Sequence, residues 1–343
     1  MATPIKTLSI QQVEACVKDA GLPKFRAEQI LTWIYQKNVS SFQEMTNLPK
    51  SARDQFDASF PIYKPSVIDK QTSSDGSRKY LLELNDGSFV ETVGLPSPDG
   101  RLTVCVSSQS GCAMACAFCA TGKAGLTRSL SPGEFVDQVH VVQEDYGMRV
   151  TNVVVMGQGE PFANYDATLA ALRIMNHPKL LNIGARHITV STCGLIKGIN
   201  AFADEPEQFT LAISLHAARQ DIRDKLMPRL ASQPLNELKR TLTSYTSKTG
   251  RRFSFEYALM KNQNDSEDDL NALVSYCKGM LCHVNLIPLN SIDDSPIKPA
   301  SASQLAHWES QLQSKGIAVS IRASRGSDIA AACGLLAYKR NAK

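Results

Sequence analysis

The sequence reads Gly111-Cys112-Ala113-Met114-Ala115-Cys116-Ala117-Phe118-Cys119 a few residues after an apolar, β-rich run at 103–106. Three thiolates separated by three and then two residues can reach one compact metal centre from a single loop, and sulfur ligands select iron–sulfur clusters, zinc or copper(I). A structural zinc site takes four ligands, as an electron-transfer cluster usually does, yet the sequence places no fourth cysteine close downstream. The spacing therefore predicts a four-iron cluster with one iron open to a substrate.

Short β-rich runs recur from about residue 100 onward, with helix-sized stretches between them. They lie at 103–106, 153–156, 187–190, 211–215, 253–258 and 284–288, with a seventh candidate at 319–322. One intervening helix is well marked, because Ser131, Pro132 and Glu134 supply an N-cap, a first-turn proline and a capping-box acid, and Gly147 ends it. The pattern predicts an α/β fold, a partial (β/α)6 TIM-like barrel.

Polar groups and thiols follow these predicted strands where each strand ends. They are Gly157-Gln158-Gly159-Glu160-Pro161, Ser191-Thr192-Cys193-Gly194, Ser214-Leu215-His216, Glu256 within the fifth run, and Asn290. In a β/α barrel the reactive groups lie at the carboxyl ends of the strands. We therefore expect these residues to meet the three cysteines at one mouth.

The remaining segments divide the chain into further parts. Residues 1–62 read as a helical accessory domain, with a capping box at Ser9 and Gln12 and a second helix near 25–34. Residues 63–97 read as a β-hairpin linker with a turn at Asp86-Gly87. The predicted barrel spans 98–325, and a tail spans 326–343.

The composition describes an ordinary globular chain of 343 residues, 43% hydrophobic and 20% charged, with a net charge of +4. No apolar run is long enough to cross a membrane, and the start does not resemble a signal peptide, so we expect a cytoplasmic protein without a membrane partner. Nine cysteines in such a chain favour reduced thiols, metal ligands or catalysis. The segment 219–252 holds nine Lys and Arg against three acids, which suits a nucleic-acid partner.

The cysteine motif with Phe118 before its last cysteine resembles the signature of radical S-adenosylmethionine (SAM) enzymes. Other segments resemble the RlmN/Cfr family of radical SAM RNA methyltransferases, nearest to its RlmN branch. These segments are Cys105-Val106-Ser107-Ser108-Gln109, Met156-Gly157-Gln158-Gly159-Glu160-Pro161, Ser191-Thr192, Leu211-Ala212-Ile213-Ser214-Leu215-His216 and Ala332-Cys333-Gly334. The resemblance covers nearly the whole chain and implies a 4Fe-4S cluster and two molecules of SAM per turnover as cofactors.

The resemblance also implies a role for each matching residue. Cys112, Cys116 and Cys119 would hold the cluster. Contacts to SAM would come from Gly159, Glu160, Ser191, Ser214, Leu215, His216 and Asn290. Cys333 would carry the methyl group as methyl-cysteine, Cys105 would resolve the enzyme–RNA adduct by a disulfide with Cys333, and Glu91 or Cys105 would accept the ring proton. A relay through a covalent thioether divides a difficult transfer to an aromatic carbon into feasible steps.

The implied reaction is methylation of carbon 2 of adenine in 23S rRNA and tRNA by a monomer, with flavodoxin or ferredoxin as electron donor. Phosphate contacts would come from the basic segment 219–252 together with Arg322, Arg325, Lys339, Arg340 and Lys343. The chain departs from the family at Gln158, where methionine is usual, at Cys193, and at Leu335, which replaces a glutamine. These departures leave open a relative that methylates carbon 8, as in the Cfr branch.

Two further alternatives are a radical SAM enzyme with a non-RNA substrate and a zinc-stabilised RNA-binding protein without chemistry. Plainer structural roles are also open for single residues. Cys16, Cys277 and Cys282 read as core thiols, and Glu91 reads without the resemblance as an exposed strand carboxylate. His216 reads as a site residue because it follows a strand, although a buried core histidine is the simpler alternative.

Overall fold

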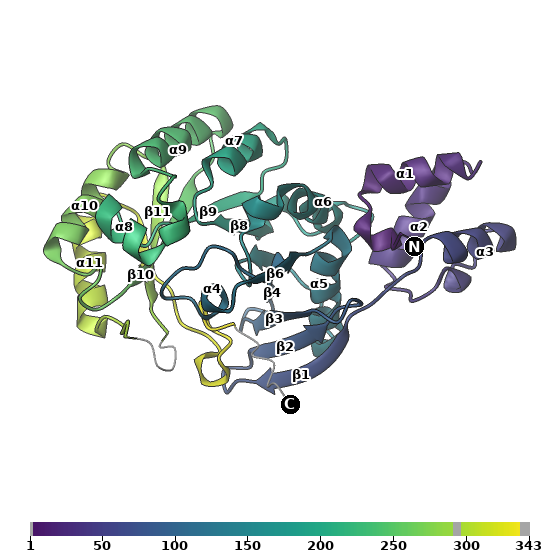
Figure 1. Cartoon of the computed structure of the whole chain (residues 1–343), viewed down its shortest axis with the longest axis horizontal. Helices are drawn as coiled ribbons and strands as arrows, with labels where there is room; N and C mark the ends of the chain where they lie inside the picture. Colours follow the sequence, from purple (N-terminus) through teal and green to yellow (C-terminus); the bar gives the residue numbers. More distant parts are fainter. Residues whose placement is uncertain (1–2, 291–295, 337–343) are drawn as a thin grey trace.

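The computed structural model describes residues 3–290 and 296–336, and its centre is one long curved sheet (Figure 1). Within the described residues this sheet has ten strands in the order β1-β2-β3-β4-β7-β8-β9-β10-β11-β12. Their bounds are β1 Ser66–Thr72, β2 Arg78–Glu83, β3 Phe89–Pro96, β4 Leu102–Val106, β7 Asn152–Val155, β8 Ile188–Thr192, β9 Thr210–Ser214, β10 Phe253–Leu259, β11 Cys282–Pro288 and β12 Val319–Ile321. A second small sheet pairs β5 (Gln109–Gly111) with β6 (Leu126–Ser129).

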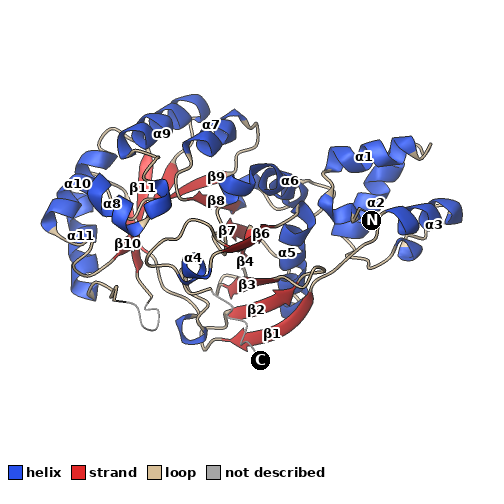
Figure 2. Ribbon diagram, viewed as in Figure 1, coloured by secondary structure: helices blue, strands red, loops and turns tan. Residues whose placement is uncertain are grey.

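In the ten-stranded sheet, the strands β4, β7, β8, β9, β10, β11 and β12 are all parallel, and neighbours follow one another in this order along the chain. Helices lie between successive strands, and most of them cover the outside of the sheet, whereas the short helix α4 (Ala120–Ala124) lies at the centre of the molecule, as Figure 2 shows. They are α4 Ala120–Ala124, α5 Pro132–Tyr146, α6 Tyr165–Asn176, α7 Ile196–Asp204, α8 Gln220–Leu226, α9 Leu235–Thr249, α10 Glu267–Cys277 and α11 Ala302–Ser314. All seven predicted strands are confirmed. Because β12 and β1 are both edges, the barrel is open, as the partial-barrel prediction requires.

The helix α5 begins and ends at the residues that the sequence predicts. Ser131 and Glu134 form the expected capping box, Pro132 stands in the first turn, and Gly147 ends the helix with φ +62°. Gly147 suits this position because a left-handed residue is strained for any side chain with a Cβ. The inward face of the helix buries Phe135 and Val139 in the main core.

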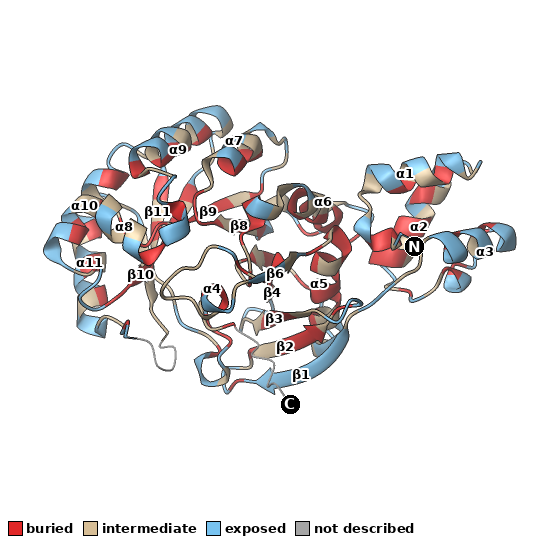
Figure 3. Ribbon diagram, viewed as in Figure 1, coloured by how far each residue is buried: buried red, intermediate tan, exposed pale blue. Residues whose placement is uncertain are grey.

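The predicted hairpin is present as β2 and β3, but it is not a separate linker. Its strands are antiparallel, and β3 pairs with β4 from Val93–Cys105 to Pro96–Leu102. A further strand, β1, pairs with β2. The sequence did not predict β1, because all its residues are exposed and it has no apolar alternation (Figure 3). The antiparallel strands therefore extend the barrel sheet at its β4 edge.

The amino-terminal residues form the predicted helical module, with the expected capping box between Ser9 and Gln12. Its elements are η1 Ile5–Thr7, α1 Ile10–Asp19, α2 Phe25–Tyr35, η2 Phe42–Glu44 and α3 Lys50–Ser59. The module contacts α5 at a buried ion pair in which Lys6 Nζ lies 2.5 Å from Asp137 Oδ1. One turn further along α5, His140 Nε2 lies 2.8 Å from the Tyr35 carbonyl oxygen.

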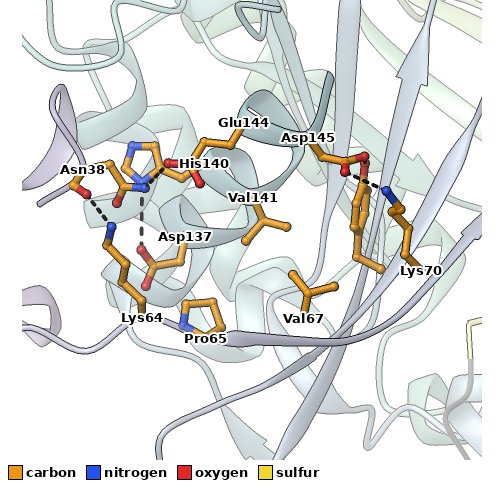
Figure 4. Close-up of a pocket in the computed structure, with 11 residues that line it drawn as sticks. Asn38, Lys64, Pro65, Val67, Lys70, Asp137, His140, Val141, Glu144 and Asp145 are labelled. Carbon is orange, nitrogen blue, oxygen red and sulfur yellow. Dashed lines mark hydrogen bonds and ion pairs between the residues drawn. The ribbon is translucent and has the colours of Figure 1, made fainter. Parts of the chain in front are cut away.

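A cavity of about 470 Å³ lies at this junction, between the module, β1 and α5. Figure 4 shows Asp137 and His140 of α5 on the same side as Asn38 and Lys64, with Lys70 and Asp145 at the other end. Lys70 Nζ donates to Asp145 Oδ1 at 2.8 Å, and Asn38 Nδ2 donates to Glu144 Oε1 at 2.6 Å.

Among the described helices, none combines the length and apolar character needed to cross a bilayer.

Candidate active site

The three-cysteine loop lies between β5 and α4, and short backbone contacts close it. The Cys112 amide donates to the Gly125 carbonyl oxygen at 2.8 Å, and the Cys119 amide donates to the Cys116 carbonyl oxygen at 3.1 Å. Gly111 has φ +77°, and a Cβ placed there would lie 2.0 Å from the Gly125 oxygen. Glycine is therefore required at 111 for the two ends of the loop to meet.

The thiols of this loop act on one another electrostatically. Burial raises the pKa of Cys112 to about 11, and nearby Cys119 adds to the shift. Burial also raises the pKa of Cys116, again with contributions from Cys119 and Cys112. Within the described part of the chain, no set of three His, Cys, Asp or Glu side chains has the geometry that would hold a single metal ion. The donor set fits a cluster, because three soft sulfur ligands meet in one loop and an iron–sulfur centre stabilises their thiolate forms.

The loop after β7 interlocks with the segment after β4. The Glu160 amide donates to Gln109 Oε1 at 2.9 Å, and the Ser108 amide donates to the Gln158 carbonyl oxygen at 2.8 Å. Gly159 has φ +100°, and a Cβ there would lie 2.6 Å from Ser108 Oγ and from Gln109 Cβ. No side chain fits at position 159, so this residue can offer a ligand only its backbone.

The carboxylate of Glu160 is buried and holds two strand-end loops together. It accepts hydrogen bonds from the Phe162 amide at 2.9 Å, the Thr192 hydroxyl at 2.7 Å and the Cys193 amide at 2.7 Å. Burial raises its pKa, and these donors oppose that rise. Because a carboxylate has about four acceptor positions, Glu160 retains room for one further donor, such as the amine of a bound ligand.

The strand ends of β8 and β9 meet as predicted. Ser191 Oγ lies 3.3 Å from Ser214 Oγ. The Leu215 side chain is fully buried, so this residue can offer a ligand only its backbone. The His216 ring packs edge-to-face on Phe118 of the cysteine loop, with ring centroids 4.7 Å apart. His216 is therefore brought to the cysteines.

His216 is neutral at working pH. Burial lowers its pKa to about 3, and the charge of Arg223 adds to that shift. Its Nδ1 accepts a hydrogen bond from the Ala258 amide at 3.0 Å. In a neutral imidazole the other nitrogen then carries the proton, so Nε2–H is the group that His216 can donate.

Cys105 and Cys333 are close together, although 228 positions separate them in the sequence. Cys105 on β4 packs with Ile329 and Ala331 of the tail, and both cysteines are free thiols. Burial raises the pKa of Cys105 to about 12, and the neighbouring Cys333 adds to the rise. For Cys333 the surrounding protein raises the pKa and the charge of Arg322 lowers it.

The tail is held over the mouth by backbone contacts on both sides of Cys333. Asn290 Nδ2 donates to the Cys333 carbonyl oxygen at 3.3 Å, and the Ser324 hydroxyl donates to Asn290 Oδ1 at 2.7 Å. On the other side, the Ala120 amide of α4 donates to the Gly334 carbonyl oxygen at 2.8 Å. Asn290 therefore lies at the mouth, where it contacts the tail that carries Cys333.

Glu91 is buried on β3, so its interpretation as an exposed strand carboxylate is wrong. Its Oε1 lies 3.4 Å from Lys79 Nζ, and its Oε2 accepts a hydrogen bond from Gln158 Nε2 at 3.3 Å. The Glu91 amide in turn donates to Gln158 Oε1 at 3.3 Å, and the Ser107 hydroxyl donates to the Glu91 carbonyl oxygen at 2.6 Å. Sequence reasoning noticed Gln158 only as a departure and missed these contacts.

The predicted phosphate contact of Arg223 is wrong, and Arg322 and Arg325 bind partners within the protein. Arg223 is fully buried, and its Nη2 donates to the Cys193 carbonyl oxygen at 2.6 Å. Arg322 faces the barrel interior, where its Nη1 lies 3.2 Å from Glu256 Oε2. Arg325 donates to the Pro96 carbonyl oxygen at 2.6 Å and pairs with Asp75. Lys339, Arg340 and Lys343 lie outside the described residues.

The sequence also did not reveal the Glu256–Arg322 pair, because Glu256 lies on β10 and Arg322 follows β12. The other cysteines behave as predicted, in that Cys277 and Cys282 are buried away from the mouth and Cys16 packs against the main core.

Comparisons with known proteins agree with this architecture. The family described as "Ribosomal RNA large subunit methyltransferase N-terminal domain" matches residues 4–62, and the Radical SAM superfamily matches residues 106–274. A Lysinibacillus sphaericus protein named "Probable dual-specificity RNA methyltransferase RlmN" is 48% identical, covering 95% of this chain and 86% of its own length. A Geobacillus kaustophilus protein of the same name is 47% identical, covering 98% and 92%. The crystal structure of a radical SAM methyltransferase from Sphaerobacter thermophilus matches with a TM-score of 0.90 and 41% identity, covering 97% of this chain and 98% of that one.

An open parallel barrel with three cysteines in one loop at its mouth defines a radical SAM enzyme, whose cofactors are a 4Fe-4S cluster and SAM. The near full-length identity with two RlmN proteins then shows that the chain belongs to the RlmN family of radical SAM RNA methyltransferases. The predicted fold class, family and cofactors are confirmed, and the zinc-stabilised binding protein is excluded as an alternative.

Proposed function

We propose that this enzyme methylates carbon 2 of adenine in 23S rRNA and tRNA, through a methyl-cysteine on Cys333 that Cys105 resolves. The observation that carries the proposal is the meeting of two free thiols, one on β4 and one on the tail, beside the three-cysteine loop. The name of the relatives, dual-specificity RNA methyltransferase, supports two RNA substrates. Such substrates place the enzyme in the cytoplasm.

The residues at the mouth divide the work of holding the cofactors. Cys112, Cys116 and Cys119 hold the cluster. Contacts to SAM come from the backbones of Gly159 and Leu215 and from the side chains of Glu160, Ser191, Ser214, His216 and Asn290. When bound, the cluster and SAM supply a carbon radical that can abstract a hydrogen atom. The neutral Nε2–H of His216 and the remaining acceptor position of Glu160 suit the polar groups of SAM.

The chain's own thiols carry the methyl group and release the product. Cys333 accepts the methyl group as a thioether, and the charge of Arg322 favours the thiolate that does so. When the carbon of this thioether has been joined to adenine, Cys105 attacks the sulfur of Cys333, the sulfur–carbon bond breaks, and the released carbon takes up a proton to become the methyl group. The disulfide that remains must be reduced by a dithiol to restore the free thiols with which the cycle starts.

Glu91 accepts the ring proton. Its buried carboxylate lies next to Cys105's strand, and Lys79 and Gln158 orient both of its oxygens. A positioned carboxylate is a competent general base even where water is scarce. Adenine must leave its stack to reach this group, so the target lies in an RNA segment that allows the base to be splayed out. We further propose a monomer that receives electrons from flavodoxin or ferredoxin.

The experiment that tests the proposal is nucleoside mass spectrometry of rRNA and tRNA from cells with and without the gene. We expect 2-methyladenosine to disappear from both RNAs in the deletion strain and to return with the wild-type gene. Complementation with Cys333→Ala fails to restore it, whereas Cys16→Ala, a matched cysteine outside the mouth, restores it fully. Loss of 8-methyladenosine instead would identify the carbon-8 branch, and unchanged RNA would refute RNA as the substrate.

A further inference from the structure

A second cavity, of about 750 Å³, opens at the amino-terminal ends of the barrel strands. Its rim includes Thr210 and Phe253, which begin β9 and β10, and Arg186 just before β8. The carboxyl ends of the same parallel strands carry the mouth with its cysteines, so the two openings lie at opposite ends of the barrel. The volume falls within the range of small-molecule sites, and none of the residues that begin β8, β9 and β10 takes part in the proposed reaction.

Three arginines, Arg186, Arg251 and Arg252, line the rim of this cavity. Arg186 donates through Nε and Nη2 to Gln208 Oε1 at 2.9 and 2.7 Å. Arg251 Nη1 donates to the carbonyl oxygens of Glu207 and Phe209 at 2.8 and 3.1 Å. These partners are neutral, so they fix the side chains without cancelling their charge.

The only carboxylate among the described residues that line the cavity is Glu256, and it is already compensated. Its Oε2 pairs with Arg322 Nη1 at 3.2 Å, and its Oε1 accepts from Asn285 Nδ2 at 2.8 Å and from the Ser254 hydroxyl at 2.9 Å. The floor is therefore close to neutral, while the rim carries about three positive charges. A concave site of this kind attracts anions and concentrates its field on them.

The geometry points to this cavity as a second binding site for a small phosphate-bearing anion, held by the guanidinium groups of Arg186, Arg251 and Arg252. Guanidinium groups match phosphate oxygens by paired hydrogen bonds. Because Arg186 and Arg251 are already held in place, little side-chain freedom is lost on binding. The three rim arginines lie at the opposite end of the barrel from the cysteines, whereas the floor of the cavity reaches Met156 and Arg322, which follow the carboxyl ends of β7 and β12.

Calorimetric titration of the anaerobically purified holoenzyme with inorganic pyrophosphate, and separately with AMP, tests the site. We expect one molecule of at least one of the two anions to bind per chain at about 0.15 M salt, where weak surface charge effects are screened. Arg252→Gln is the first variant, because Arg252 donates no hydrogen bond to another described residue and its loss leaves the fold intact. We expect this variant to weaken binding about tenfold, and Arg186→Gln to weaken it further.

Arg240→Gln is the matched control, since Arg240 is exposed on α9 and pairs only loosely with Glu237 at 3.8 Å. It removes the same charge away from the cavity and leaves the affinity unchanged. Failure of the wild-type protein to bind either anion at millimolar concentration would overturn the proposal, as would equal affinity in Arg252→Gln. A loss confined to RNA affinity, without small-anion binding, would assign the arginines to the RNA backbone and overturn it too.

Discussion

Arg322 connects the barrel interior with the two thiols. Its Nη1 pairs with Glu256 and lies 3.7 Å from the Met156 sulfur, and its charge lowers the pKa of both Cys105 and Cys333. A sequence shows that a residue is basic but not whether a buried carboxylate on another strand faces it. This is why the sequence placed Arg322 among the phosphate contacts.

Replacing Arg322 by Met makes Cys333 less reactive at a given pH. Burial already raises the pKa of this thiol, and loss of the cation raises it further, so the thiolate fraction at pH 8 falls and the reactivity profile moves to higher pH. We expect iodoacetamide to label Cys333 about tenfold more slowly, which corresponds to one pH unit. Arg322→Lys keeps the charge and should retain most of the reactivity. An unchanged profile in Arg322→Met would show that the cation does not act on this thiol.

Gln158 positions Glu91 through hydrogen bonds at both the amide and the carboxylate. Gln158→Met removes both contacts and introduces the residue that we expect in the family. A hydrogen bond to a charged group contributes about 1.5–3 kcal/mol, so we expect single-turnover formation of 2-methyladenosine to slow about tenfold or more. Formation of 5′-deoxyadenosine in the absence of RNA, measured in the same preparation, should stay at the wild-type rate. A methylation rate equal to wild type would remove Gln158 from the mechanism.

At the scale of elements, the tail from β12 to Leu336 is clamped by the turn between β1 and β2. Asp75 Oδ2 accepts a hydrogen bond from the Gly326 amide at 3.0 Å and lies 3.4 Å from Arg325 Nε. Asp328 Oδ2 accepts from the Ser74 amide at 3.1 Å. The tail, which contains Cys333, therefore runs from β12 to the turn between β1 and β2, the two edges of the sheet (yellow in Figure 1).

Asp75→Asn should loosen this clamp without disturbing the barrel. Burial disfavours the charged form of Asp75, but hydrogen bonds from Ser77, Gly326 and Ser73 outweigh burial and hold its pKa below the ordinary value. With a depressed folded-state pKa, the clamp is at full strength above about pH 4 and weakens as the pH falls and Asp75 is protonated. We expect faster hydrogen exchange at 323–336 and faster labelling of Cys333 in the variant at pH 7. Asp99→Asn, in an exposed loop, is the control, and equal exchange in both variants would contradict the clamp.

The sequence predicted the elements in which burial produces a regular pattern of apolar residues. It did not predict the elements that lack such a pattern. The barrel strands alternate with helices and are apolar because both faces are covered, and α5 has its capping residues in order. Strand β1 has no buried face and is held by backbone pairing to β2 and by the ion pair between Lys70 and Asp145. The cysteine loop was predicted by spacing, whereas the contacts of Glu91, Gln158 and Arg322 join distant segments that spacing cannot relate.

At the scale of the whole molecule, the helical module is attached to the barrel by a buried charge pair. Lys6 and Asp137 are each about 4% exposed, and the next turn of α5 adds the contact between His140 and Tyr35. A Cβ on Gly133 would lie 2.3 Å from Lys6 Cβ, so the module and α5 approach each other as closely as glycine permits. The pair therefore fixes the orientation of the module relative to the mouth.

Lys6→Met should destabilise the protein strongly, because it leaves the Asp137 carboxylate buried without its cation. Breaking a buried pair by removing one partner costs about 3–5 kcal/mol, which urea unfolding followed by circular dichroism can measure. The double variant Lys6→Met with Asp137→Leu should recover most of the loss. Lys179→Met is the matched control, since Lys179 pairs with Glu28 of the same module on the surface and exposed pairs contribute about 0–1 kcal/mol. Equal losses in both single variants would contradict this assignment.

The clamp between the β1–β2 turn and the tail also constrains how this enzyme can be recombined with its relatives. Its two halves, around Asp75 and around Arg325, stand 250 positions apart, one before the cysteine loop and one after the last barrel strand. A chimera that takes only its carboxyl-terminal third from a relative would combine the relative's tail with this enzyme's β1–β2 turn. The residues of that turn match a different tail. Segments 73–77 and 323–336 should therefore be exchanged together, as one inherited unit.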